Sequence, residues 1–150
     1  MPTLGGSFSP WREGEGRLQR LETQAMSISF TRLGDRAPIS LYPGVAFQFG
    51  GKRHKGALLV SPGGVYNWSS ASDGFDEAGL FGFLNMEEAH RCDLLLLGTG
   101  PKSFLLPAGF AAKVDRRGLG LEAMGTAAAC RTYNVLLAEN RQFLAALLPI

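Results

Sequence analysis

Residues 94–140 read LLLLGTGPKSFLLPAGFAAKVDRRGLGLEAMGTAAACRTYNVLLAEN, and this stretch decides the fold class. The unbroken apolar run Leu94–Leu97 is typical of a strand that is buried on both faces of a sheet. Behind it, the pattern predicts a helix, a strand and a second helix over residues 108–117, 119–124 and 127–139. Strands that alternate with helices in this way are joined as parallel strands by right-handed crossovers.

Residues at the expected helix ends support these boundaries. Pro107 suits the first turn of a helix, and Gly118 suits the left-handed position just after one. Thr126 is expected to cap the second helix, and Asn140 to end it. For residues 142–148, periodicity leaves helix and strand open. We favour a last strand, because Asn140 and the following arginine interrupt the helical pattern.

The part of the chain before residue 94 has a different pattern. Val45, Phe47 and Phe49 alternate with Ala46 and Gln48, which indicates a half-buried strand. Two turns with paired glycines follow, at residues 50–51 and 61–64, and they separate strands expected at Lys55–Val60 and Val65–Trp68. This half therefore predicts an antiparallel meander, and the whole chain predicts an α/β domain with a mixed sheet.

The segment between the meander and residue 94 shows weaker signals. Ser69–Gly79 is polar and contains glycine, so we expect a loop. Asn85, followed three residues later by Glu88, is expected to start a short helix that ends near Cys92.

Composition limits the domain organisation and the class of protein. The chain has 150 residues, is 45% hydrophobic and carries a formal net charge of +2. This is enough apolar material for one core and too little positive charge for a strongly basic nucleic-acid binder. We expect a flexible N-terminal arm over residues 1–37 and a single domain over residues 38–150, with Met26 as an alternative start of translation.

The same composition bears on location. The N-terminus lacks the pattern of a secretory signal, and its acidic residues do not suit a mitochondrial transit peptide. No apolar run reaches the roughly 18 residues of a membrane span. Two cysteines are too few for a disulfide scaffold. We therefore expect a bacterial cytoplasmic protein with no cofactor, no metal and no nucleic-acid partner.

The candidate ligand site consists of two turns at strand ends. Gly98, Thr99 and Gly100 follow the buried strand, and Thr126 opens the next helix, with Arg131 in its second turn. Ligands bind at such carboxyl ends in open α/β sheets, and free amides at a helix start favour an anion. The alternative, which we favour, is that the glycines only let the chain reverse, because this pattern is far less specific than a phosphate-binding loop.

Two other residues have both a functional and a packing interpretation. Cys130 lies near a helix start, which can activate a thiol. A small buried side chain packed against Tyr133 and Leu137 is the favoured interpretation. Trp68 is either a core residue, which we favour, or an exposed interface aromatic. We find no catalytic triad, metal motif or pair of catalytic carboxylates.

Taken in order, the quoted residues resemble a known family. The segments LLLLGTG, GLGLEAMGT and AAACRTYNVLLAENR, together with the upstream hairpin, Ser61–Pro62 and Trp68, resemble the NADH dehydrogenase (complex I) assembly factor 3 family and its uncharacterised bacterial relatives. The most specific block runs from Ala129 to Asn134 and includes Tyr133. Gly125 departs from the family, which often has Asp there.

This resemblance covers about residues 40–150 and carries its own expectations. It implies a three-layer fold with a mixed central sheet and an antiparallel last strand. It also implies protein partners in the assembly of the respiratory NADH dehydrogenase, in mitochondria if the protein is eukaryotic, and no catalytic residue to carry over.

Two functions therefore remain open. The favoured one is a non-enzymatic assembly or interaction protein, with an exposed patch near Gly98, Trp68 or the loop Ser69–Gly79. The alternative is a protein, possibly an enzyme, that binds an anionic small molecule between the Gly98 turn and Thr126.

Overall fold

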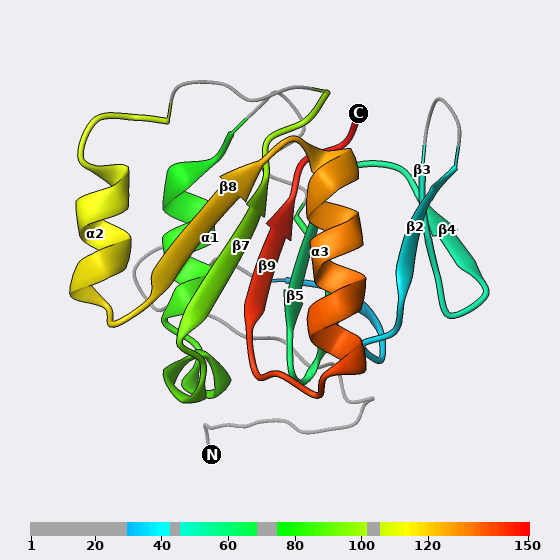
Figure 1. The fold of residues 1–150 in the computed structure, drawn as a ribbon, viewed down its shortest axis with the longest axis horizontal. Helices are drawn as coiled ribbons and strands as arrows, with labels where there is room; N and C mark the ends of the chain where they lie inside the picture. Colours follow the sequence, from blue (N-terminus) through cyan, green and yellow to red (C-terminus); the bar gives the residue numbers. More distant parts are fainter. Residues whose placement is uncertain (1–29, 43–45, 69–74, 102–105) are drawn as a thin grey trace, which may run out of the picture.

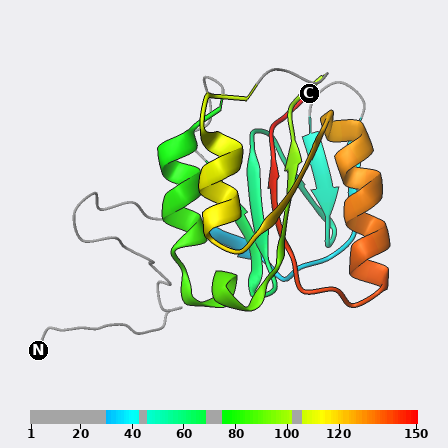
Figure 2. The same ribbon diagram turned by 60° about the vertical axis from the view of Figure 1, so that its left-hand side comes forward.

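The chain forms three layers around a mixed sheet. The computed structural model describes residues 30–42, 46–68, 75–101 and 106–150. Six strands of the central layer lie in the order β1-β6-β5-β9-β7-β8. Helices α1 and α2 cover one face, and α3 covers the other together with a small sheet of β2, β3 and β4 (Figures 1 and 2). The expected three-layer α/β fold with a mixed sheet is confirmed.

The second half of the chain follows its predicted order. Strand β7 (Leu94–Gly98) pairs in parallel with both β8 (Gly120–Met124) and β9 (Leu144–Leu147). Helix α2 (Phe110–Arg116) connects β7 to β8, and α3 (Thr126–Ala138) connects β8 to β9. Residues 144–147 therefore form a strand, as favoured. This strand is antiparallel to β5 on its other side.

Both of these helices end as the sequence predicts. Gly118 has φ of +79° and Asn140 has φ of +58°, so each adopts the left-handed conformation. The amide of Gly118 donates to Asp115 O at 2.9 Å, and that of Asn140 donates to Leu137 O at 3.0 Å. These bonds satisfy carbonyl groups that the helix itself leaves open.

The expected meander is divided between two sheets. Strands β2 (Ile39–Tyr42), β3 (Ala46–Phe49) and β4 (Lys52–His54) form the small sheet. Strands β5 (Leu58–Ser61) and β6 (Gly64–Asn67) belong to the central one. The strand expected over Lys55–Val60 is therefore wrong in its first half, since β5 begins only at Leu58. Gly56 has φ of +100°, which interrupts the strand and lets the chain change sheets.

The folded domain begins earlier than expected. Strand β1 (Arg32–Gly34) pairs antiparallel with β6, and Phe30 is 4% exposed. The Phe30 ring meets the Phe83 ring edge to face, with centroids 5.6 Å apart. Residues 30–37 are thus part of the domain and not of an arm, because their apolar side chains join a core that only the tertiary fold creates. Residues 1–29 lie outside the described residues.

Helix α1 corrects the segment before β7. It spans Glu77–Leu84, and the Asp76 side chain caps it by accepting from Gly79 N at 3.1 Å. The expected loop over Ser69–Gly79 is wrong at its end, and residues 69–74 lie outside the described ranges. Asn85 ends α1 instead of starting a helix, and Glu87–Arg91 forms the short 3₁₀ helix η2.

The core has two parts, one on each face of the central sheet. Trp68 is 1% exposed and packs with α1 and α2, so its core interpretation holds and its interface interpretation is wrong. Tyr133 and Phe143 anchor the part under α3. None of the helices in the described ranges is both long and apolar enough to cross a membrane.

Candidate functional site

The structure brings the two predicted turns together at the carboxyl ends of three strands. Gly98 of β7 is in register with Met124 of β8 and with Leu147 of β9. The Thr99 amide donates to Met124 O at 2.8 Å, and the Leu148 amide donates to Gly98 O at 3.0 Å. The expected neighbourhood of the turns therefore exists, and it includes the end of β9, which the sequence did not place there.

Thr126 connects these strand ends through its buried hydroxyl group. Its Oγ1 donates to Leu148 O at 2.6 Å and accepts from the Gly100 amide at 2.8 Å. The Thr126 amide in turn donates to Gly100 O at 2.8 Å. Thr126 is thus not the helix cap that we expected, since Gly125 holds that position and the hydroxyl is turned toward the sheet.

Close packing also fills the space beside Gly98. A Cβ atom there would lie 2.9 Å from Thr126 Oγ1, 3.0 Å from Leu147 Cδ2 and 3.2 Å from Ala129 Cβ. The first two distances are too short or very tight for real side chains, so this residue lets α3 approach β7. The glycine serves helix packing here and leaves no room for a ligand atom.

Little of the expected anion site remains available. Among the described residues, the first-turn amides of α3 that bond to no other group are those of Ala127 and Ala128. Arg131 is exposed on the second turn. A helix start with two open amides attracts an anion only weakly, and the hydroxyl and glycine amides that would define a specific ligand are already paired within the protein.

The family motif on α3 holds the small sheet in place. Tyr133 donates its hydroxyl hydrogen to Ala37 O at 2.9 Å. Asn134 accepts from the Ile39 amide at 2.9 Å and donates to Ile39 O at 2.8 Å. These three bonds fix the residues where the chain leaves β1 for the small sheet, which gives both motif residues a structural role.

Cys130 has the surroundings of a packing residue. It is 4% exposed and belongs to the core under α3. Burial raises the pKa of its thiol to about 11, although the charge of Arg131 acts in the opposite direction. Because the thiolate is the nucleophilic form of cysteine, a thiol with this pKa is poorly reactive at neutral pH.

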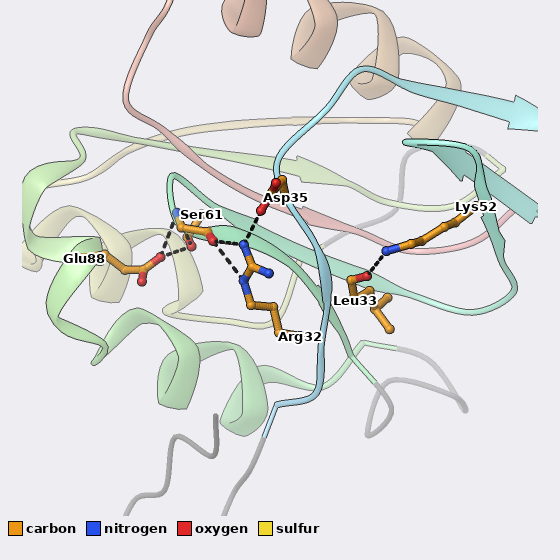
Figure 3. A network of polar contacts seen from close by, with 7 residues as sticks. Arg32, Leu33, Asp35, Lys52, Ser61 and Glu88 are labelled. Atoms are coloured by element: carbon orange, nitrogen blue, oxygen red, sulfur yellow. Dashed lines mark hydrogen bonds and ion pairs between the residues drawn. The ribbon is translucent and has the colours of Figure 1, made fainter. Parts of the chain in front are cut away.

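A polar network that the sequence did not predict surrounds the turn between β5 and β6 (Figure 3). Glu88 of η2 accepts from the Ser61 hydroxyl and, at 3.1 Å, from the Gly63 amide. Arg32 of β1 donates to Gly63 O from Nε at 3.1 Å and from Nη2 at 2.8 Å. Its Nη2 also lies 2.7 Å from Asp35 Oδ1. The turn is thus held from both sides.

This network is a junction and not a reactive centre. Ser61 is fully buried, so no substrate reaches its hydroxyl. The hydrogen bond and charge of Arg32 lower the pKa of Asp35, and burial raises the pKa of Tyr66. Within the described ranges, no three His, Cys, Asp or Glu side chains gather in a way that would hold a metal ion.

A basic hollow lies between α1 and α2, on the face of the central sheet opposite to α3. It has a volume of about 270 Å³ and is lined by Phe81, Lys113, Arg116 and Arg117. The Arg117 guanidinium lies 4.9 Å from the Phe81 ring centre and bonds to Asn85 Oδ1 at 2.7 Å. Lys113 forms an ion pair with Glu77 at 2.9 Å. Two of the three cations are therefore already paired within the protein.

The sequence of this chain matches a protein family and several known proteins. The family described as "Protein of unknown function (DUF498/DUF598)" matches residues 39–148. An uncharacterised protein of Rhodobacter capsulatus is 38% identical over 113 residues, which are 75% of this chain and 85% of the relative. The NADH dehydrogenase [ubiquinone] 1 alpha subcomplex assembly factor 3 of Xenopus tropicalis is 29% identical over 114 residues. The match covers 74% of this chain and 60% of that longer protein.

Solved structures share the fold. An outer membrane protein from Bartonella henselae has a TM-score of 0.67 and 32% identity, with 77% of this chain and 96% of that chain covered. A Bordetella pertussis protein described as a Mth938-like domain has a TM-score of 0.61 and 29% identity, with 75% and 85% covered. The homologues of this chain include proteins named as NADH dehydrogenase assembly factors. The chain itself belongs to the DUF498/DUF598 family of proteins of unknown function.

Proposed function

We propose that this protein is a non-enzymatic assembly factor that binds other proteins during maturation of the respiratory NADH dehydrogenase, in the cytoplasm of a bacterium. Its homology to vertebrate proteins named as NADH dehydrogenase assembly factors supports this role. The shared region is the folded domain, since the family match spans residues 39–148. The role of the longer relatives is proposed here for that domain alone.

The observation that carries the proposal is the closed cluster of strand ends. In an open α/β sheet this edge is where a ligand would bind. Here the Thr126 hydroxyl bonds to Leu148 O and Gly100 N, and the Gly98 position is filled by α3. Because the described residues at this edge bond and pack mainly with one another, the protein is better suited to act through its outer surface.

Deletion and purification in the native host test the proposal together. A strain that lacks the protein should assemble less NADH dehydrogenase, measured by in-gel activity after native electrophoresis. A tagged full chain should enrich subunits of that enzyme relative to an unrelated tagged protein of similar size. Normal enzyme levels in the deletion strain, combined with no enrichment of subunits, would reject this function.

The alternative function is tested by ligand screening. We expect phosphorylated and carboxylated metabolites to leave the melting temperature of the protein unchanged within about 1 °C. A larger stabilisation that is lost in Arg131→Ala, but retained in Arg141→Ala, would restore the anion site at the start of α3. Arg141 is a suitable control because it is an exposed arginine beyond the end of the same helix.

A further inference from the structure

The two edges of the central sheet differ in how they are protected. Strand β1 is three residues long, and its register with β6 shifts between Arg32 and Gly34. Lys52 of β4 donates to Leu33 O at 2.6 Å, so a side chain occupies a backbone acceptor of this strand (Figure 3). Short, irregular and covered edges are how proteins prevent unwanted strand pairing.

Strand β8 forms the other edge, and within the described ranges it has none of these protections. It spans five residues that pair in regular parallel register with β7. It is the last strand in the order of the sheet, and Gly120, Glu122 and Ala123 are exposed. Figure 1 shows it as the outermost strand of the sheet, next to β7. No other described strand pairs with its outer side.

The hydrogen bonds of β8 identify which backbone groups are open. The Gly120 amide donates to Asp93 O and the Met124 carbonyl accepts from the Thr99 amide, each at 2.8 Å. Both residues therefore direct their backbone groups toward β7. Because successive residues of a strand direct these groups to opposite sides, Leu121 and Ala123 direct theirs outward. The outer edge thus presents two amides and two carbonyls to an added strand.

Glu122 is the only charged residue of β8, and its charge affects which strand can be added. If two copies paired antiparallel so that Leu121 of one bonded to Ala123 of the other, all four open groups would be satisfied. That arrangement places Glu122 directly opposite its own copy, with Cβ atoms about 4.5–5.5 Å apart. Two carboxylates so placed repel each other, so the register that suits the backbone best is disfavoured for self-association.

We propose that the outer edge of β8 binds an extended segment of a partner protein as an added antiparallel strand, and that this segment carries a lysine or arginine opposite Glu122. The open backbone groups of Leu121 and Ala123 supply the binding, as in other complexes formed by strand addition. Glu122 selects a basic residue and rejects a second copy of this chain. The inference rests on the proposed function, for which it names the binding surface.

Peptide binding to the full protein is the direct test. The probes are two acetylated and amidated peptides, TVTKTVT and TVTETVT, which differ only at the central residue. Hydrogen exchange followed by NMR should show that the lysine peptide slows exchange of the Leu121 and Ala123 amides. We expect the glutamate peptide to bind at least about threefold more weakly, which corresponds to the energy of one cross-strand charge pair. Equal binding of both peptides, or no protection of either amide at millimolar peptide, rejects the proposal.

Two variants make the test specific. Ala123→Pro removes an outward amide only, so it should abolish binding of both peptides while the Thr99 amide keeps its protection. Glu122→Lys should reverse the preference between the peptides without touching the backbone. Sedimentation of the wild-type protein should show a monomer. A wild-type dimer that Ala123→Pro dissociates would mean that the occupant is a second copy, and would overturn the proposal.

Purification in the native host separates the two proposals. If NADH dehydrogenase subunits are recovered equally by wild type, Ala123→Pro and Glu122→Lys, the assembly role stands and the β8 surface is wrong. If the lysine peptide binds as expected, but no subunits are recovered and the deletion strain has normal enzyme levels, the β8 surface stands and the assembly role is wrong.

Discussion

Asn134 of α3 forms with Ile39 the pair of hydrogen bonds that a neighbouring strand would otherwise form. Ile39 N lies 2.9 Å from Asn134 Oδ1, and Asn134 Nδ2 lies 2.8 Å from Ile39 O. Ile39 is buried, so its backbone groups have little access to water. One side chain thus fastens the small sheet to the helix that covers the central sheet.

Asn134→Ala should lower the free energy of unfolding by about 1–3 kcal/mol, because it leaves both backbone groups of Ile39 without a partner. Urea denaturation measures the change. The neighbouring Val135→Ala is the control, since Val135 is 57% exposed and its truncation should change stability by less than about 0.5 kcal/mol. Equal effects of the two substitutions would contradict the role assigned to Asn134.

Gly98→Ala should destabilise the protein by about 1–3 kcal/mol through overpacking against α3. Gly120→Ala is the matched control on the adjacent strand, because the nearest atom to its added Cβ is Asp93 O at an ordinary 3.6 Å. We expect Gly120→Ala to be neutral within about 0.5 kcal/mol. Thermal and urea denaturation of both variants decide the matter, and a neutral Gly98→Ala would show that α3 can move away from β7.

Thr126→Val keeps the shape of the side chain but removes the hydroxyl that joins Gly100 and Leu148. The loss of both bonds in a buried position should cost about 1–3 kcal/mol. Thr132→Val is the same substitution on the same helix, where the hydroxyl donates to the weak acceptor Met124 Sδ at 3.5 Å. Its cost should be clearly smaller, and a cost equal to that of Thr126→Val would argue against the strand-end cluster as a stabilising unit.

Glu88→Ala should destabilise the protein by about 1.5–3 kcal/mol, because hydrogen bonds to a charged acceptor are stronger than neutral ones. It removes the acceptor of the Ser61 hydroxyl and the Gly63 amide. Glu87→Ala changes the net charge equally at an exposed neighbouring position, so it controls for charge. The network would have no stabilising role if both variants unfolded at the same urea concentration.

Alkaline pH should destabilise the protein through Cys130. Burial raises the pKa of this thiol from 9.0 to about 11, so the unfolded chain releases the proton at lower pH than the folded one. The contribution of this thiol to stability is therefore constant below about pH 9 and is lost as pH rises from 9 toward 11. The free energy of unfolding, measured by urea denaturation across this range, should fall less with pH in Cys130→Ala than in the wild type.

Alkylation of Cys130 at pH 8 should be about a hundredfold slower in the folded protein than in the unfolded chain. This factor follows from the difference between the two pKa values, since only the thiolate reacts. Mass spectrometry after brief exposure to iodoacetamide measures it. A rate equal to that of an unfolded thiol would contradict the expected protection of Cys130, and a redox-sensing role would require a rate faster than that.

The second half of the fold was predictable because its signals are local. The run Leu94–Leu97, the glycine at 118 and the break at Asn140 each define one element through periodicity or backbone conformation. The first half was not, since a hairpin pattern does not specify which sheet each strand joins. Helix α1 was missed because its apolar residues do not occupy a single face and its two glycines weaken the helical pattern.

The candidate site divides in the same way. The meeting of the Gly98 and Thr126 turns follows from parallel neighbours, which the sequence predicts. The closure of that cluster depends on Leu148, the residue after β9, and β9 had to be placed between β5 and β7 first. The contact between Glu88 and Ser61 joins residues 27 positions apart, and the open edge of β8 depends on the strand order. No local pattern reports either of them.

The position of β9 has a consequence for protein synthesis. Residues 144–147 form a central strand, so β5 and β6 on one side and β7 and β8 on the other are joined through it. While a ribosome is still making the chain, these two groups of strands are complete but cannot unite. A nascent chain that stops before residue 144 would expose the flanks of both β5 and β7. Release of a chain truncated before residue 144 should therefore yield an aggregation-prone product, even though most of the core residues are present in it.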